Sequence, residues 1–187
     1  MKKNAVMIAL LTGVLAGPPA ALAACRTGSA ESAPALAPAP DDSLQTGIAL
    51  FQQGEYAKAE AALRQATGPD ASAYLAASLA KQKKYAEAEA PARAAVEANP
   101  TNEIAVAALG AALVGQATPA KFDEAIEKMS EAIKRKPDLA YAYFWRGQAY
   151  YGKKKADRMV ADFETFLKLA PKSPEAPIVR QLLSSLG

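Results

Sequence analysis

The sequence predicts an all-α fold, a solenoid of about four helix-turn-helix units closed by a C-terminal helix. The first observation is a repeat of about thirty-four residues between residues 43 and 171. The second is that apolar residues recur at spacings of three and four within each unit, which puts them on one helix face. The third is that three units end on a proline, at Pro100, Pro137 and Pro171. Solenoids of this kind expose an extended face that mostly binds other proteins.

The first two units have the same design. In the first, apolar residues from Leu44 to Phe51 form one helix, and Gly54 marks the turn to the next. In the second unit, Leu79 precedes the turn and Ala88 follows it. Pro91 falls inside this second helix, and an interior proline costs about 3 kcal/mol. We therefore expect a kink or a restart of the helix at Pro91.

The third and fourth units vary this design. The third has a longer internal turn, in which Pro119 is expected to start the next helix. In the fourth, Met159 and Phe166 replace small residues, so its helices should lie further apart or pack against something extra. Residues 172–187 are expected to form a capping helix that opens at Ser173-Pro174-Glu175. Its predicted apolar side consists of Ile178, Leu182, Leu183 and Leu186.

The residues at equivalent places in the units resemble the tetratricopeptide repeat family. That family has Gly or Ala where its two helices cross, a large residue three positions later, and Ala on the second helix. The matching crossing residues are Gly47, Ala76, Gly110 and Gly147; the large residues are Leu50, Leu79, Leu113 and Tyr150; the alanines are Ala59, Ala88 and Ala125. The resemblance covers residues 43–171 and implies a right-handed solenoid in which the first helices line a concave groove.

Transferring the groove positions of the family to this chain gives a predicted partner-binding surface. Its residues are Ile48, Phe51, Tyr74, Ala77, Lys81, Ala111, Val114, Tyr141, Phe144, Trp145, Gln148 and Tyr151. The surface is apolar, with an aromatic C-terminal end, and its natural ligand would be a peptide or protein segment. It lacks the Lys/Asn/Arg pattern with which chaperone-binding members hold a peptide carboxylate. The aromatic cluster around Trp145 has a second interpretation, as core packing of the last unit.

The N-terminus has the pattern of an export signal. Lys2 and Lys3 precede an apolar run over residues 5–16, which is too short for a membrane span. Leu22-Ala23-Ala24-Cys25 then resembles the lipobox of bacterial lipoproteins. The resemblance implies a signal peptide over residues 1–24, cleavage before Cys25, and acylation of the Cys25 thiol as a membrane anchor. Arg26, where inner-membrane lipoproteins often carry Asp, implies the outer membrane facing the periplasm.

A plain secretory signal is the alternative, because Ala21-Leu22-Ala23 also fits a cleavage site. Cleavage there would release a soluble periplasmic or secreted protein. Residues 25–42 are rich in Pro, Ala and Ser and are expected to be a disordered tether. At about 3.1 Å per residue, an extended tether would hold the solenoid up to about 50 Å from the membrane.

Composition argues against several functions. The chain has no histidine and one cysteine, so the usual general base, thiol nucleophile and zinc ligand sets are missing. There is no glycine-rich phosphate loop. We expect no enzymatic activity, cofactor or metal. The net charge of +3 does not favour nucleic-acid binding, although the lysines near residues 134–136 and 153–155 leave open an anionic partner or membrane surface.

Two kinds of function therefore remain. The favoured one is a lipid-anchored scaffold or adaptor that binds proteins of the bacterial envelope, within an assembly or cell-wall machinery. The other is a soluble binding module, or an accessory that regulates a cell-wall enzyme without contributing catalytic residues.

Overall fold

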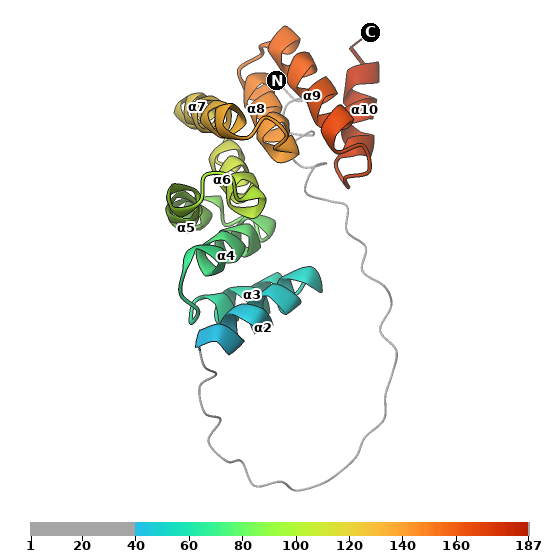
Figure 1. The fold of residues 1–187 in the computed structure, drawn as a ribbon. Helices are drawn as coiled ribbons and strands as arrows, with labels where there is room; N and C mark the ends of the chain where they lie inside the picture. The colour runs from blue at the N-terminus through green and yellow to red at the C-terminus, as the bar shows by residue number, and fades with distance from the viewer. Residues whose placement is uncertain (1–39, 187) are drawn as a thin grey trace, which may run out of the picture.

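The computed structural model describes residues 40–186, which form nine helices and no strand. The helices, labelled as in Figure 1, are α2 (Pro40–Gln52), α3 (Tyr56–Leu63), α4 (Pro69–Lys81), α5 (Tyr85–Ala98), α6 (Glu103–Gly115), α7 (Pro119–Arg135), α8 (Ala140–Gly152), α9 (Ala156–Leu169) and α10 (Ala176–Ser184). The predicted signal peptide, Cys25 and residues 25–39 of the tether lie outside the described residues. Residues 40–42 belong to α2, so the expected boundary at residue 43 is three residues late.

The helices form four antiparallel pairs, α2–α3, α4–α5, α6–α7 and α8–α9, stacked into a solenoid (Figure 1). The first helices of the pairs pack in a row, α2 on α4, α4 on α6 and α6 on α8. The second helices α3, α5 and α7 each pack against the first helix of the next pair. The row of first helices is therefore the closely packed inner side of the solenoid. The all-α solenoid predicted from the sequence is confirmed.

Each pair turns through one residue in the left-handed region of backbone conformation. These residues are Gly54 (φ 80°), Lys83 (φ 64°), Ala117 (φ 54°) and Lys154 (φ 57°). In three of the turns the next amide bonds back into the preceding helix, as in Lys84 N to Leu79 O at 2.9 Å and Lys155 N to Tyr150 O at 2.9 Å. This geometry satisfies carbonyls that a helix end leaves free, and glycine is the residue that adopts it without strain. Only the first unit uses glycine.

Local signals set the helix starts. Pro119 begins α7, as predicted, and the Thr118 hydroxyl accepts a hydrogen bond from Lys121 N. The Asn102 side chain accepts one from Ala105 N at the start of α6. α5 runs through Pro91 as one helix, so the alternative of a restart is wrong. Packing of the buried residues Ala88, Ala92 and Ala95 holds α5 together on both sides of the proline.

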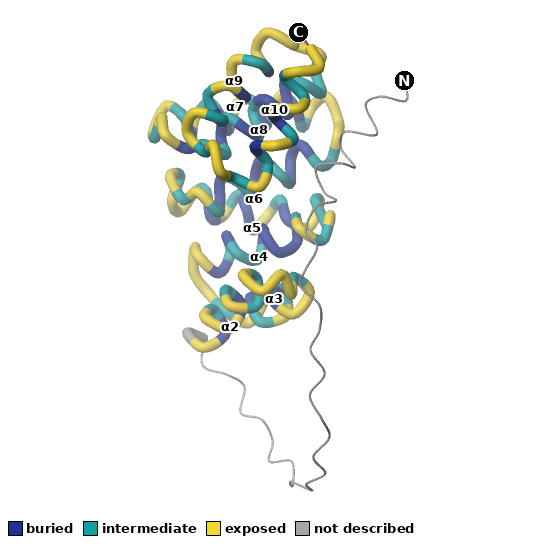
Figure 2. Tube along the Cα trace, turned by 90° about the vertical axis from the view of Figure 1, so that its right-hand side faces the viewer, coloured by how far each residue is buried: buried dark blue, intermediate teal, exposed yellow. Residues whose placement is uncertain are grey.

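The core changes character along the solenoid. In the second and third units it is built on small residues, and ten buried alanines lie in α4, α5 and α6 alone, which allows the helices to approach closely. In the last unit Phe144, Phe163 and Phe166 are at most 1% exposed and pack with Met159. Figure 2 shows the buried residues between the helix layers, with α2 and α3 as a largely exposed end layer.

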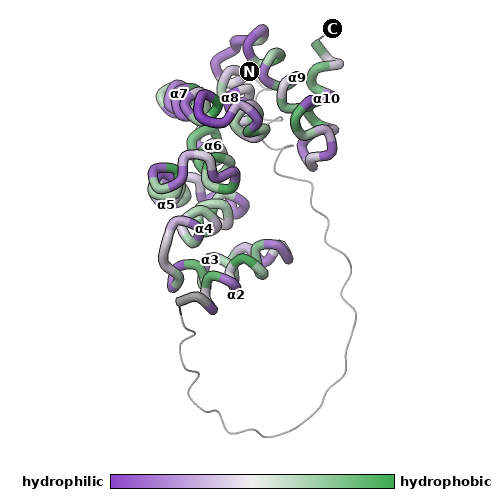
Figure 3. The backbone as a smooth tube through the Cα atoms, viewed as in Figure 1, coloured by the Kyte–Doolittle hydropathy of each residue, from purple (hydrophilic) through white to green (hydrophobic). Residues whose placement is uncertain are grey.

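The C-terminal helix closes the aromatic end of the core. α10 packs on α9, and its Val179 belongs to the same buried cluster as Met159 and Phe166. The extra packing element expected for the last unit is therefore present. Figure 3 shows apolar residues along much of α10, after a hydrophilic turn. The predicted apolar side needs correction: α10 begins at Ala176, Val179 is its most buried large residue, and Leu186 is 53% exposed.

A polar network joins α5, α6 and α7 around the long third turn. Glu89 accepts hydrogen bonds from Lys121 Nζ at 2.5 Å, Gln116 Nε2 at 2.6 Å and Arg93 Nη2 at 2.7 Å. Arg93 also pairs with Glu124. Burial alone would raise the pKa of Glu89, but these three donors outweigh it and lower the pKa to about 2. The network supplies contacts between α6 and α7 where the turn is longest.

Candidate functional site

The candidate site is the inner face of the solenoid, formed by α2, α4, α6 and α8. All twelve residues predicted to bind a partner lie on these four helices. They differ in how far they are accessible. Lys81 is exposed; Ile48, Phe51, Tyr74, Ala111, Tyr141, Trp145 and Tyr151 are partly exposed; Ala77, Val114, Phe144 and Gln148 are buried.

The N-terminal part of the inner face contains an aromatic cluster. The Phe51 ring lies 5.5 Å from that of Tyr74 in the next unit and 5.5 Å from that of Tyr56, both edge to face. Tyr56 was not among the predicted site residues, although its place before the second helix is where the family carries a tyrosine. Because Phe51 and Tyr74 stay partly exposed, they combine packing between units with an aromatic surface.

The middle of the inner face is built from small side chains. Ala77 and Val114 are 9% and 8% exposed and belong to the main buried cluster. Ala111 remains partly exposed. A chain laid along this face would approach the backbone of α4 and α6 closely here.

Trp145 occupies the C-terminal part of the inner face. A Cβ placed on Gly110 of α6 would lie 2.4 Å from Trp145 Cγ, so the indole of α8 packs directly over this glycine. Gly110 was expected at the crossing of the two helices of its own unit. Gly47 and Gly147 do have that role, facing Leu63 and Phe163. In the third unit the nearest neighbour is instead the tryptophan of the next unit.

Phe144 corrects the predicted site. It is 1% exposed, and its ring lies 4.9 Å from that of Trp145 and 5.0 Å from that of Phe166. Phe144 is therefore a core residue and offers no surface to a partner in this structure. Of the two interpretations of the aromatic cluster, core packing holds for Phe144, whereas Trp145 and Tyr151 stay partly exposed.

Two buried donors on α8 have no hydrogen-bond partner in the described part of the chain. They are Trp145 Nε1 and Gln148 Nε2, on residues three positions apart and therefore on one helix face. Gln148 is 7% exposed. Unpaired buried donors are uncommon in folded proteins, since each costs about 1–3 kcal/mol.

Tyr141 joins the inner face to the C-terminal helix. Its hydroxyl donates to Glu175 Oε2 at 2.9 Å, across the turn that precedes α10. Burial, together with the negative charge of Glu175, raises the pKa of Tyr141 well above its usual range, so the hydroxyl stays a donor. Tyr141 therefore has a structural role besides its place on the inner face.

Metal-ligand clusters and membrane-spanning helices are both absent from the described residues. Within residues 40–186, no three or more His, Cys, Asp or Glu side chains lie together as a metal would require. The same part of the chain contains no helix with the length and hydrophobicity of a membrane span.

The fold and this inner face define a helical-repeat protein with an extended binding surface. Models of the tetratricopeptide repeat match residues 44–103 and 140–173, and a TPR repeat model matches residues 121–154. These ranges together span more than half of the 187 residues. The chain is a tetratricopeptide-repeat protein, a family whose members are generally non-enzymatic interaction scaffolds. No curated protein matches the sequence significantly.

Solved structures share the fold. A thermophilic TPR protein of Thermus thermophilus aligns with a TM-score of 0.68 and 21% identity, over 80% of this chain and 84% of that one. MamA (41-end) of Desulfovibrio magneticus RS-1 aligns with a TM-score of 0.60 and 25% identity, over 73% and 78%. A double mutant of MamA RS-1 aligns with a TM-score of 0.59 and 26% identity, over 71% and 75%.

Proposed function

We propose that this protein is a lipid-anchored scaffold of the bacterial envelope that binds a protein segment on its inner face. The observation that carries the binding role is the row of partly exposed aromatic side chains on the first helices. Phe51 and Tyr74 lie at one end of the row, and Trp145 and Tyr151 at the other. Tyrosine, tryptophan and phenylalanine are the side chains that most often anchor interfaces.

The ligand best suited to this face is an extended or helical peptide segment. Its apolar side chains would contact the two aromatic ends, and its backbone would lie over the small residues Ala77 and Ala111 between them. Binding would thus cover the apolar surface that the partly exposed aromatic side chains present.

The anchoring part of the proposal depends on the sequence around Cys25. A cysteine that follows Leu22-Ala23-Ala24 resembles the acylated residue of bacterial lipoproteins. Acylation there would place the protein on an envelope membrane, and Arg26 favours the outer membrane facing the periplasm. An envelope assembly or the cell-wall machinery would then supply the partner.

Intact mass spectrometry of the mature protein from its native host tests the anchor. We expect a mass of residues 25–187 plus acyl chains. A mass that begins at Ala24 without lipid would refute the anchor and favour a soluble periplasmic or secreted binding module. The Ala21-Leu22-Ala23 sequence supports this second candidate. Identification of a cell-wall enzyme among co-purifying proteins would favour the regulatory accessory.

Variants of the partly exposed aromatic residues test the inner face. Tyr74→Ala and Tyr151→Ala should each lower the affinity for a co-purifying partner at least tenfold, since interface aromatic residues often contribute about 2 kcal/mol or more. The helical content of both variants should stay unchanged. Leu169→Ala, which removes an exposed apolar residue of α9, is the matched control and should leave binding unchanged. Retained binding in both tyrosine variants would refute the inner face as the site. Phe144→Ala is unsuitable, because it would disrupt the core.

A further inference from the structure

The edge of the solenoid that carries the helix-turn-helix turns has an excess of positive charge. We name four lysines the basic edge: Lys81 and Lys83 at the α4–α5 turn, and Lys154 and Lys155 at the α8–α9 turn. Ion pairs connect a turn with the second helix of the preceding unit, Lys84 with Glu60 of α3 and Lys153 with Asp123 of α7. The turns therefore follow one another along the solenoid on the same side.

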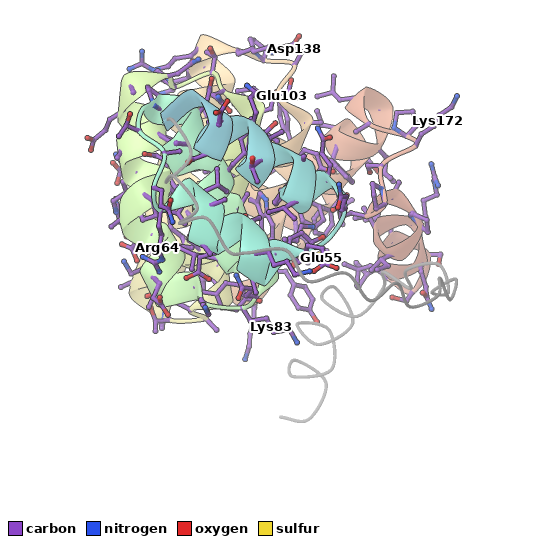
Figure 4. The ribbon with its side chains drawn as sticks, turned by 90° about the horizontal axis from the view of Figure 1, so that it is seen from below. Glu55, Arg64, Lys83, Glu103, Asp138 and Lys172 are labelled. Atoms are coloured by element: carbon purple, nitrogen blue, oxygen red, sulfur yellow. The ribbon has the colours of Figure 1, made fainter. Side chains whose placement is uncertain are left out.

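Figure 4 shows this arrangement from below. Glu55 and Lys83, which belong to turns inside units, lie on one side of the molecule. Glu103 and Asp138, which belong to turns between units, lie on the opposite side. The basic edge is thus separated from the connections between units by the length of the helices.

The four lysines are exposed, and over residues 40–186 the ion pairs of the structure leave them without a carboxylate partner. Nearby carboxylates are already engaged, since Glu55 pairs with Lys58 and Asp123 with Lys153. Asp157, in the first turn of α9, is the acidic residue that stays outside these pairs. Positive charge therefore exceeds negative charge along this edge.

Two of the lysines stand where local structure disfavours them. Lys83 and Lys154 have φ values of 64° and 57°, a conformation that is costly for a residue with a side chain and that glycine adopts readily. The equivalent position of the first unit is Gly54, which avoids this cost. Residues that break a local rule with no evident structural gain are expected at functional positions.

We propose that the basic edge lies against the anionic lipid surface of a membrane. Positive charges from two separate turns fit an extended negative surface better than one small anion. Membrane lipid is chosen over other polyanions because the proposed tether from Cys25 would hold the solenoid within about 50 Å of the bilayer, and this choice rests on the proposed anchor. The inner face, apart from Lys81 at its margin, would then remain free for a protein partner.

The test uses the full chain carrying Cys25→Ser, so that acylation is impossible and every variant has the same N-terminal segment. One variant adds Lys83→Gly, Lys154→Gly and Lys155→Gln, in which glycine suits the turn conformation and unfolding is not expected. The matched control removes the same charge from the other edge with Lys134→Gln, Arg135→Gln and Lys172→Gln. Binding is measured by sedimentation with vesicles of phosphatidylcholine alone and of equimolar phosphatidylcholine and phosphatidylglycerol.

The basic-edge variant should bind the anionic vesicles about 100-fold more weakly, because each lysine near an anionic surface contributes roughly fivefold in affinity. The control variant should lose less than about fivefold in affinity for the anionic vesicles. Binding to neutral vesicles should be the same for the two variants and their parent. Equal loss in both variants would overturn the proposal, because it would mean that net charge alone acts. The proposal would also be overturned if the basic-edge variant bound the anionic vesicles as well as the parent protein does but lost binding to an acidic polypeptide.

A second measurement is independent of any vesicle binding by the N-terminal segment. Acetylation of lysines in the vesicle-bound chain, followed residue by residue with mass spectrometry, should show protection of Lys83, Lys154 and Lys155 but not of Lys134 and Lys172. Equal modification of the two sets would overturn the proposal. Absence of acylation at Cys25 in the host would refute the anchor without changing these vesicle results, so the two failures are distinguishable.

Discussion

Trp145 of α8 packs its indole directly over Gly110 of α6, where a Cβ would lie 2.4 Å from Trp145 Cγ. This contact joins the third and fourth units through their first helices. It also joins the two largest hydrophobic clusters, since Trp145 packs against both. Trp145 is the only tryptophan of the chain, so tryptophan emission reports on the surroundings of this one side chain.

Gly110→Ala should therefore destabilise the protein and move Trp145. The added methyl group has no space, and overpacking costs about 1–3 kcal/mol. Alanine is a better helix former than glycine by about 0.5–1 kcal/mol, which offsets part of the loss. We expect a net loss of about 1–2 kcal/mol in the free energy of unfolding, measured by urea denaturation, with a shift in tryptophan emission.

Replacing the indole of Trp145 with a smaller side chain provides the control. Adding Gly110→Ala to a Trp145→Leu variant should cost clearly less than adding it to the native chain, because the smaller side chain leaves room. Because Trp145→Leu and Trp145→Leu/Gly110→Ala lack tryptophan, their unfolding is followed by circular dichroism. Equal costs in both backgrounds would show that the two residues do not interact.

Lys83→Gly and Lys154→Gly should each stabilise the protein by about 1 kcal/mol. Both lysines have positive φ, which glycine adopts without the penalty of a side chain. Ala94→Gly on the exposed face of α5 is the matched control, and there glycine should destabilise by about 0.5–1 kcal/mol. Urea denaturation of the three variants measures these differences. A loss of stability at both turns would contradict the turn geometry.

Asp162→Ala should be among the most damaging single substitutions. Asp162 is 5% exposed and accepts from Arg146 Nε at 2.8 Å and Nη2 at 2.7 Å, while Arg146 Nη1 donates to Ser130 at 3.0 Å. These bonds join α7, α8 and α9. Removing the carboxylate leaves the partly buried guanidinium uncompensated, at a cost of about 3–5 kcal/mol.

The double variant Arg146→Met/Asp162→Leu separates this mechanism from simple loss of packing. It removes both charges and fills a similar volume, so it should retain more stability than Asp162→Ala in thermal or urea denaturation. A double variant as unstable as the single one would show that the ion pair itself, and not the stranded charge, determines the effect.

The architecture could be predicted from the sequence because most units repeat the same local signals. Glycine or alanine at the helix crossing, alanine on the second helix and proline at the end are each set by neighbours a few residues away. Pro119 as a helix start was predictable for the same reason. Pro91 shows the limit of this reasoning, because packing on both sides of the proline keeps α5 continuous.

The candidate site was less predictable because the accessibility of a side chain depends on neighbours in other units. The spacing that puts Phe144 beside Trp145 and Tyr141 holds equally for a binding surface and for a core. Only the placement of Phe163 and Phe166 makes Phe144 a core residue. The seating of Trp145 over Gly110 likewise depends on how the third and fourth units stack, which the pattern within one unit does not contain.

Acid should weaken the protein through Glu89 and Glu60. Hydrogen bonds from Lys84 and Arg64 lower the pKa of Glu60 to about 2, and the network around Glu89 lowers its pKa to about 2 as well. A glutamate in the unfolded chain titrates near 4.5, so the folded state binds fewer protons between these values. The stabilisation is therefore complete above about pH 4.5 and is lost as the pH falls toward about 2.

Each of these carboxylates should contribute about 1–2 kcal/mol, since solvent screens part of the interaction. Urea denaturation at pH 7 and pH 3 measures the loss, and Glu89→Gln should lower stability at pH 7 while reducing the difference between the two pH values. Glu164→Gln, on the exposed face of α9, is the control and should leave the pH dependence unchanged. If Glu89→Gln kept the full acid sensitivity, then the network between α5, α6 and α7 would not be its source, and the titrating groups would have to lie elsewhere in the chain.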